Sequence, residues 1–456
     1  MRNYTRREIV TGLASGVALA LAAPRVVLAG GGDAGSFVVA EDSDVPVDGK
    51  GATVFISHPI VLRSGHYANI KFAPAKGYEG PGPIFMARDG KVIHENISVC
   101  GFKGPGCKVL SSSKIGNSFI AIGNCTYSDN GSLKRTVLSE RANMRFSPSI
   151  KVDDASLFNA GDFVWIGDGK YRVREVDDNH IFFVMDGAPN LISPKVFSGA
   201  YDRCNAGQFV TLNEDDNNGI RIGDGGYGWD IDTSKATINC SNNGRSGFYH
   251  SCKKYNGKQI IENITAVSNG YINIGLGFMN KGWVRNCIAK NSSNNCIDIF
   301  ESKNSVDVYN NIVSGSGVDG IFIGGNGQTA RVYDNHVSQC RRVGILINAR
   351  TKPIENVYIK NNKVTGSGAN SITLTAVESG LVTLNTFDGS IYREAVFLER
   401  RNGLSLSGTL NISDNTILNA KTGDVGSNYH GYSKAGQARV MIKSTRKLSV
   451  NGIDGY

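Results

Sequence analysis

The sequence predicts an all-β chain wound into a parallel β-solenoid, in which short strands stack coil upon coil. Three observations predict this fold: short alternating runs rich in Ile and Val recur about every two dozen residues, asparagines recur with them, and Gly, Asn and Ser fill the connections. No segment keeps a 3.6-residue apolar period for three turns, which excludes helical repeats. The inward positions hold Ile and Val rather than Leu, which argues against leucine-rich repeats, and propeller blades need about twice the period.

The composition is that of a large folded protein with many turns. The 456 residues include 56 Gly and 11 Pro, and 40% are hydrophobic and 20% charged, which excludes a disordered or collagen-like chain. The net charge of +9 favours an acidic partner. Because Lys and Arg form no block, we expect no nucleic acid as a partner.

The first 29 residues are predicted to be a twin-arginine export signal. Arg6 and Arg7 precede a weakly apolar run over 10–23, and 27–29 (Val-Leu-Ala) offers a small-residue cleavage site. The apolar run is too short to span a membrane. We therefore expect a periplasmic or secreted protein with no membrane span after signal removal.

The cysteines are predicted to be small apolar core residues. There are nine, an odd number, and none forms a Cys-x-x-Cys pair. Twin-arginine export carries folded proteins, so the thiols would be enclosed in a reducing compartment, with Cys100 and Cys107 as the one local pair that could form a disulfide. No three histidines or carboxylates stand at metal-ligand spacing, so we predict no metal site of the zinc type.

The chain divides by the clarity of its repeat. The segment 30–149 is predicted to hold the N-terminal coils, 150–205 a small antiparallel β insert, 206–420 the main solenoid, and 421–456 a C-terminal cap or tail. In the main solenoid we align the recurrent asparagines as one column, whose amides bond from coil to coil at tight turns. The aligned residues are Asn239, Asn263, Asn286, Asn311, Asn335, Asn362, Asn385 and Asn415.

Three segments illustrate the repeat best: 309–316 (Tyr-Asn-Asn-Ile-Val-Ser-Gly-Ser), 333–338 (Tyr-Asp-Asn-His-Val-Ser) and 360–366 (Lys-Asn-Asn-Lys-Val-Thr-Gly). With these segments the chain resembles the right-handed parallel β-helix proteins of the pectate-lyase-like superfamily, clearly so over 210–420. The resemblance implies a right-handed parallel β-helix and a place among proteins that act on or bind polysaccharides.

One column of side chains is predicted to face outward along the coils. In each short strand the flanking apolar residues point inward, so the middle residue points out. Arg221 and Asp298 then lie three coils apart, roughly 14 Å at ~4.8 Å per coil, which gives room for about three sugar units. The predicted column is Arg221, Tyr249, Asn273, Asp298, Phe322, Leu346, Thr373 and Phe397.

This column suits β-elimination on an acidic, uronate-containing polysaccharide. Removal of the proton beside the uronate carboxylate needs a group that stabilises the growing negative charge, and we assign Arg221 and Asn273 to that role. It also needs a base, and we assign Tyr249, with Lys253 nearby.

The acidic residues of the same coils have two predicted roles. Asp298 and Glu301 orient the other groups or hold a cation such as Ca²⁺. Asp224 and Phe322 complete the candidate set as substrate-binding residues.

The segment 297–302 (Ile-Asp-Ile-Phe-Glu-Ser) stands where mannuronan C5-epimerases, of the same superfamily, carry an Asp-Pro-His-Asp motif. Asp298 matches the first Asp and Glu301 the last, whereas Ile299 replaces the proline and Phe300 the histidine. Because that histidine is the family's expected base, the match indicates the position of the groove more than the reaction.

Two alternatives stay open. Paired carboxylates, Asp298 with Asp319 or with Glu301, suit a glycoside hydrolase, although polygalacturonase-like β-helices also carry a Gly-His-Gly that this chain lacks. A non-catalytic solenoid could instead bind glycan on Tyr and Phe rings. His250 has the phase of the inward-facing isoleucines and is predicted to be buried rather than catalytic.

Overall fold

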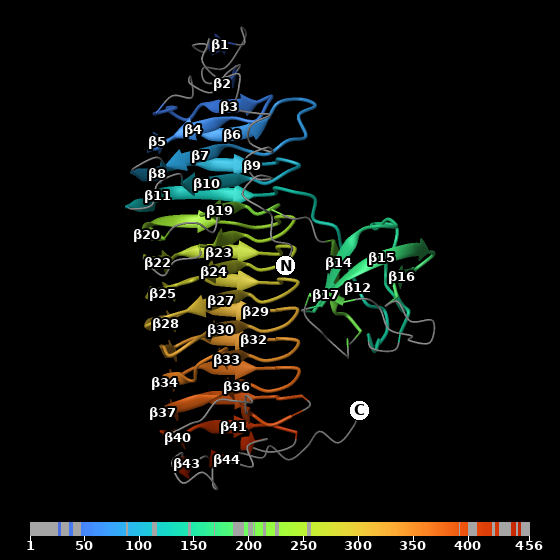
Figure 1. Ribbon diagram of the computed structural model, residues 1–456, viewed down its shortest axis with the longest axis vertical. Helices are drawn as coiled ribbons and strands as arrows, with labels where there is room; N and C mark the ends of the chain where they lie inside the picture. The colour runs from blue at the N-terminus through green and yellow to red at the C-terminus, as the bar shows by residue number, and fades with distance from the viewer. Residues whose placement is uncertain are drawn as a thin grey trace.

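The computed structural model describes residues 26–28, 36–39, 47–87, 90–111, 116–144, 147–167, 169–185, 196–198, 204, 206–212, 216–223, 228–252, 257–391, 393–399, 408–421, 425–427, 439–443 and 446–447. This part of the chain contains strands and turns but no helix. It forms a long parallel β-solenoid with a small antiparallel subdomain beside it (Figure 1). The predicted fold class is confirmed.

One face of the solenoid is a 12-stranded parallel sheet, here called the front sheet. Each of its strands pairs with the equivalent strand one coil away. Its strands, in spatial order, are β4 (Val61–Arg63), β7 (Ile84–Ala87), β10 (Cys107–Ser111), β19 (Ile220–Ile222), β21 (Phe248–His250), β24 (Ile274–Gly277), β27 (Ile297–Ser302), β30 (Ile321–Gly325), β33 (Ile345–Ala349), β36 (Ile372–Thr375), β39 (Val396–Glu399) and β42 (Val425–Ser427).

The other two faces form one continuous sheet of 25 strands. The faces join because β11 (Asn117–Ser128) and β20 (Trp229–Asn239) each run round the corner between them. The second face also contains β5 (Gly65–Ala68), β8 (Lys91–Glu95), β22 (Lys258–Glu262), β25 (Lys281–Arg285), β28 (Ser305–Tyr309), β31 (Thr329–Tyr333), β34 (Ile354–Lys360), β37 (Val377–Thr383), β40 (Thr409–Ser413) and β43 (Arg439–Lys443). The third contains β1 (Val26–Leu28), β2 (Ser36–Val39), β3 (Thr53–Ile56), β6 (Lys71–Pro74), β9 (Ser98–Cys100), β23 (Ile264–Val267), β26 (Ile288–Lys290), β29 (Ile312–Ser314), β32 (His336–Ser338), β35 (Lys363–Thr365), β38 (Thr386–Asp388), β41 (Thr416–Leu418) and β44 (Arg446–Lys447).

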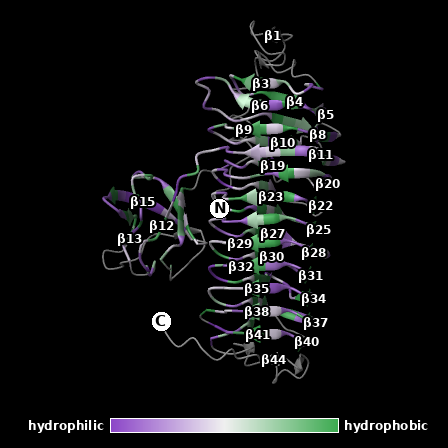
Figure 2. Cartoon of the chain, turned by 180° about the vertical axis from the view of Figure 1, so that it is seen from behind, coloured by the Kyte–Doolittle hydropathy of each residue, from purple (hydrophilic) through white to green (hydrophobic). Residues whose placement is uncertain are grey.

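The strands form because their side chains alternate between two environments. In β28, Val306 and Val308 are fully buried, whereas Ser305, Asp307 and Tyr309 face outward. Repeated over the coils, the inward side chains build one apolar core along the whole solenoid. Figure 2 shows the result: apolar residues follow the strands and hydrophilic residues the turns.

The recurrent asparagines occupy two adjacent positions, not the single column predicted. The strand register aligns Asn286 with Asn310, and Cys287 with Asn311. Asn286 and Asn310 are exposed turn residues with φ of 55°, a left-handed conformation that asparagine tolerates. Asn311 is buried, and its amide donates to Asn335 Oδ1. The buried ladder consists of Asn311, Asn335, Asn362, Asn385 and Asn415, and does not include Asn239, Asn263 or Asn286.

The antiparallel subdomain interrupts the solenoid without breaking its stack. Its first and last strands span 135–212, a wider range than the 150–205 expected, and it has its own apolar core. The coils on either side still pair directly, β10 with β19 and β11 with β20. Its strands are β12 (Arg135–Val137), β13 (Ser149–Lys151), β14 (Phe163–Ile166), β15 (Gly169–Asp177), β16 (His180–Phe183), β17 (Val196–Ser198) and β18 (Phe209–Leu212).

The two ends of the chain are described only in part. Arg6, Arg7 and the apolar run 10–23 of the predicted signal lie outside the described residues. Toward the C-terminus, β42 to β44 add another coil beyond 420. In the described part of the chain, no helix is long and apolar enough to cross a membrane. None of the nine cysteines forms a disulfide, and all except Cys100 are buried.

Candidate functional site

The front sheet presents the outward column that the sequence predicts, with one exception. Strand register runs from Arg221 to Tyr249, then to Gly275, and from there to Asp298 and Phe322. Arg221 and Asp298 are therefore three coils apart and face the same side. Gly275 takes the place predicted for Asn273.

Asn273 is buried and does not belong to the outward column. Its amide donates to Lys290 O at 2.8 Å, and its Oδ1 accepts from Asn269 Nδ2 at 2.7 Å. The predicted strand lies two residues too early, because β24 begins at Ile274 and its two outward positions are glycines, Gly275 and Gly277. Glycine hides the alternation of polar and apolar side chains on which the prediction depended.

Those two glycines make room for two aromatic rings. A Cβ on Gly275 would lie 2.8 Å from Tyr249 Cδ2, and one on Gly277 would lie 2.5 Å from Phe300 Cε2, so each ring lies directly over a glycine. The two rings are inclined by only 24°, with centroids 6.3 Å apart, and Phe278 meets Phe300 edge-on. We call Tyr249, Phe300 and the glycines beneath them the aromatic platform. Flat, half-exposed rings of this kind are suited to contact with the apolar face of a sugar ring.

A basic cluster lies on the N-terminal side of the platform. Lys108 and Arg221 are neighbours in the outward column, and both bind the Asp216 carboxylate, Lys108 Nζ at 3.0 Å from Asp216 Oδ2. Burial and the charge of Arg221 lower the pKa of Lys108. With two cations to one carboxylate, the cluster keeps a net positive charge where a uronate carboxylate would approach.

Asp298 is a buried carboxyl group on the C-terminal side of the platform. It is 8% exposed, and Asn295 Nδ2 donates to its Oδ2 at 2.8 Å, whereas its Oδ1 has no hydrogen-bond partner in the part of the chain that the structure describes. Burial raises the pKa of Asp298 from 3.8 to about 7, against the Asn295 hydrogen bond, which lowers it. Such a carboxyl can exchange a proton near neutral pH, as a general acid or base must.

The raised pKa predicts a pH dependence of stability. Because folding raises the pKa of Asp298 above its unfolded value of 3.8, its protonated form stabilises the fold fully below about pH 4, and this contribution is lost as the pH rises through about 7. Between these limits the urea midpoint of the unchanged protein should fall relative to that of Asp298→Asn, which cannot ionise. Parallel midpoints for the two proteins across this range would show that Asp298 has an ordinary pKa.

Two further acidic residues beside Asp298 are held by arginines. Glu301 lies in a β-bulge of β27 with φ of 56°, and Arg350 Nη1 is 2.5 Å from its Oε1. Asp319, one coil beyond Asp298, is fully buried, and its Oδ1 accepts a hydrogen bond from Arg342 Nε at 2.8 Å. Asp319 is thus fixed in an ion pair, while Glu301 remains partly exposed at the sheet edge.

Two features weigh on the Ca²⁺ that these carboxylates were predicted to hold. Asp298, with its pKa raised to about 7, is only partly ionised at neutral pH, and Glu301 is engaged by Arg350. Among the described residues, no three His, Cys, Asp or Glu side chains are grouped to hold a metal ion.

The remaining predicted residues have varied positions. Phe322 follows Asp298 in the outward column and is half-buried. Lys253 and Asp224 lie outside the described residues. His250 is fully buried, with Nδ1 3.0 Å from Ile222 O, and burial lowers its pKa to about 4. The prediction that His250 lies inside the solenoid is confirmed.

Several residues of the site were missed from the sequence. Lys108 could have been found by extending the outward column to the coil before Arg221. Phe300 was noted only as a replacement for a family histidine, and its partner Gly277 was overlooked. Asn295 contacts Asp298 from a turn, and Arg350 contacts Glu301 from another coil. No local sequence pattern marks such contacts.

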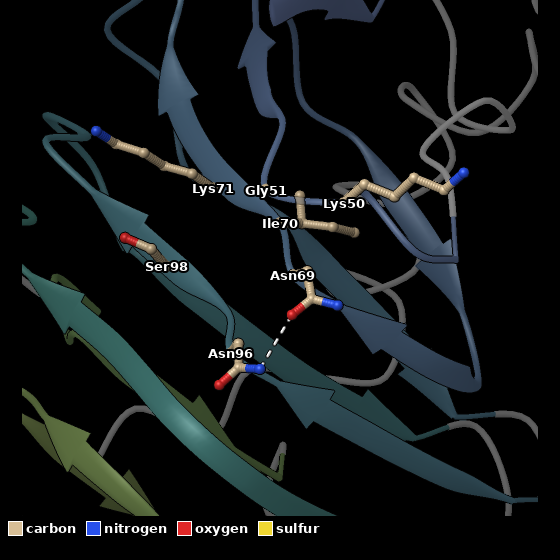
Figure 3. A pocket seen from close by; sticks show the side chains of 7 residues that line it. All are labelled: Lys50, Gly51, Asn69, Ile70, Lys71, Asn96 and Ser98. Carbon is tan, nitrogen blue, oxygen red and sulfur yellow. Dashed lines mark hydrogen bonds between the residues drawn. The ribbon is translucent and has the colours of Figure 1, made fainter. Parts of the chain in front are cut away.

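A separate surface hollow of about 400 Å³ lies at the N-terminal coils (Figure 3). It follows the turns at Asn69 and Asn96, whose amides bond to each other at 3.0 Å, with Lys50 and Lys71 beside them. It is not on the front sheet and contains no carboxyl or aromatic side chain. The column around Asp298 is therefore the better candidate for chemistry.

Comparison with known proteins supports the fold. No family model matches the sequence, and no curated protein matches it. Among solved structures, a mutant of the periplasmic alginate epimerase AlgG aligns with a TM-score of 0.50 and 9% identity, covering 91% of this chain and 85% of that one. The Azotobacter vinelandii mannuronan C-5 epimerase AlgE4 A-module aligns at 0.35 and 10% identity (89% and 90% covered), and the Gp54 tailspike of Acinetobacter baumannii bacteriophage AP22, in complex with capsular saccharide, at 0.24 and 13% (80% and 64%). The likeness to AlgG shows a shared β-helix fold.

Proposed function

We propose that this protein is an exported enzyme that cleaves an acidic, uronate-containing polysaccharide by β-elimination along the outward column of the front sheet. The observation that carries the proposal is the Asp298 carboxyl, which is buried, has its pKa raised to about 7, has one oxygen without a hydrogen-bond partner among the described residues, and lies next to an aromatic platform.

The order of groups along the outward column suits the reaction. The basic cluster at Arg221 and Lys108 balances the uronate carboxylate. Tyr249, one coil on and acting as the phenolate beside the Arg221 cation, takes the proton from the adjacent ring carbon and becomes the neutral phenol. The electron pair of that C–H bond forms the ring double bond as the bond to the glycosidic oxygen breaks. Asp298, beyond Gly275, gives its proton to the leaving oxygen. Each proton lost by the sugar is thus matched by one returned to it.

The fold is consistent with such a substrate. The solved structure described above at a TM-score of 0.50 is a periplasmic alginate epimerase, so the same architecture accommodates chemistry on a uronate polymer. The net charge of +9 also favours an acidic polymer.

The test is a panel of polysaccharides: alginate, polygalacturonate and a glucuronate polymer, with a neutral glucan as control. We expect at least one acidic polymer, and not the neutral one, to yield an unsaturated product detected by its ultraviolet absorbance. Reducing ends without that absorbance would replace elimination with hydrolysis, which a carboxyl with a pKa of about 7 can also serve as general acid. Polymer that binds but is unchanged would overturn the enzymatic proposal in favour of a glycan-binding solenoid.

Two variants of Tyr249 separate binding from chemistry. Tyr249→Phe keeps the ring over Gly275 but removes the hydroxyl, so polymer binding should persist while elimination falls by about 100-fold or more. Tyr249→Ala should weaken both, because the platform loses a ring. Phe397→Ala, near the far end of the same column, is the matched control and should behave like the unchanged protein. Full activity of Tyr249→Phe would exclude the tyrosine as base.

A further inference from the structure

The antiparallel subdomain is docked against the turn that leads into β27. Gly167, at the tip of the β14–β15 hairpin, accepts a hydrogen bond from Asn294 Nδ2 at 2.9 Å through its carbonyl oxygen. The rings of Trp165 and Tyr271 are 4.7 Å apart, and Thr211 Oγ1 donates to Ser293 Oγ at 2.6 Å. The subdomain therefore meets the solenoid within a few residues of Asp298.

A chain of hydrogen bonds continues from this contact to Asp298. Asn294 Oδ1 accepts from the backbone N–H of Asn295 at 2.8 Å, and Asn295 Nδ2 donates to Asp298 Oδ2 at 2.8 Å. The other end of the Asn295 amide is fixed as well, because Oδ1 accepts from Asp319 N at 3.0 Å. Asn294, Asn295 and Asp298 are each no more than 8% exposed, so water has little access to the chain.

We propose that the antiparallel subdomain is a positioning element for Asp298. By holding Asn294, it fixes the turn from which Asn295 donates a hydrogen bond to one carboxyl oxygen of Asp298, while the other oxygen has no hydrogen-bond partner among the described residues. The catalytic use of Asp298 rests on the proposed function, but its positioning does not, and can be measured with no substrate present.

The charged groups around Asp298 belong to the solenoid. Asp319 with Arg342, and Glu301 with Arg350, lie on its C-terminal side, and Tyr249 lies across Gly275 on the other. The described link to the subdomain consists of neutral amides and a carbonyl. Changing the docking contact should therefore alter the hydrogen bonding of Asp298 without altering the charge near it.

The experiment is a carbon NMR titration of the Asp298 carboxyl in the full-length protein, assigned by its loss in Asp298→Asn. In Asn295→Leu the ionised carboxylate loses its donor, so the pKa of Asp298 should rise by about one unit. Asn294→Ala and Trp165→Ala, which loosen the docking contact, should raise it less but in the same direction. Trp165→Phe, which keeps a ring against Tyr271, should restore the original titration.

A matched control separates docking near Asp298 from docking elsewhere. Arg341 also holds the subdomain, through the carbonyls of Ala206 and Gly207, but on a later turn, so Arg341→Ala should leave the titration unchanged. The proposal fails if Asn295→Leu shifts the pKa of Asp298 while Asn294→Ala and Trp165→Ala do not, since the effect then stops within the solenoid. Failure of the proposed function looks different: the shifts are present, but no polysaccharide is turned over.

Discussion

Replacing Asp298 with asparagine should reduce turnover of the polysaccharide by about 100-fold or more, the usual contribution of a general acid or base. The substitution keeps the shape of the side chain and an oxygen that can accept from Asn295 Nδ2, so the fold should persist. What is lost is a proton that can be transferred near neutral pH. The measurement is the rate of product formation at saturating polymer, with circular dichroism to confirm folding.

The control for Asp298→Asn is Asp307→Asn. Asp307 also faces outward from a strand of the solenoid, but on the second face, where it pairs with Arg331. Its loss should leave turnover unchanged. Equal rates for Asp298→Asn and the unchanged protein would remove the groove around Asp298 from consideration as the active site.

The largest effect on stability is expected at the buried asparagine ladder. Asn335 donates to Val308 O and Asn362 Oδ1, and its own Oδ1 accepts both the backbone and side-chain N–H of Asn311. Asn335→Leu would leave the backbone N–H of Asn311 and one N–H of its side-chain amide buried without an acceptor; the other amide N–H keeps Val284 O. At about 1–3 kcal/mol for each unsatisfied group, the loss should be about 3 kcal/mol or more.

Urea unfolding followed by circular dichroism measures this loss, and Asn310→Gly is the control. Asn310 precedes the ladder residue of its own coil, is exposed and has φ of 55°, a conformation that glycine adopts freely. Its replacement should change stability little. If Asn335→Leu unfolded at the same urea concentration as Asn310→Gly, the ladder would contribute little to holding the coils together.

The fold could be predicted because its cause is local and repeated. Each strand of the front sheet carries its own alternation, so runs such as Ile321–Ile323 and Ile345–Ile347 establish both the inward face and the coil length. The prediction failed where local signals were ambiguous. Asn310 and Asn311 stand side by side, and the sequence alone does not distinguish the turn residue from the ladder residue. At β24 the outward positions are glycines, so no polar residue marks where the strand begins.

The site was predictable to the extent that it lies on one strand position. Arg221, Tyr249 and Asp298 follow from counting coils. The pKa of Asp298 does not, because it depends on how deeply the strand is covered, which raises it, and on the hydrogen bond from Asn295 in a turn, which lowers it. The role of the subdomain is still less visible, since Gly167 and Asn294 are separated by 127 residues of sequence.

The excursion of the chain between β11 and β19 has a consequence for how such proteins can diversify. Since the flanking coils are hydrogen-bonded to each other across the excursion, an entire module can enter or leave there while every strand keeps its partners. The length and topology of the solenoid therefore do not depend on which module lies beside the outward column. A different module can therefore be placed beside Asp298 while the supporting architecture stays intact.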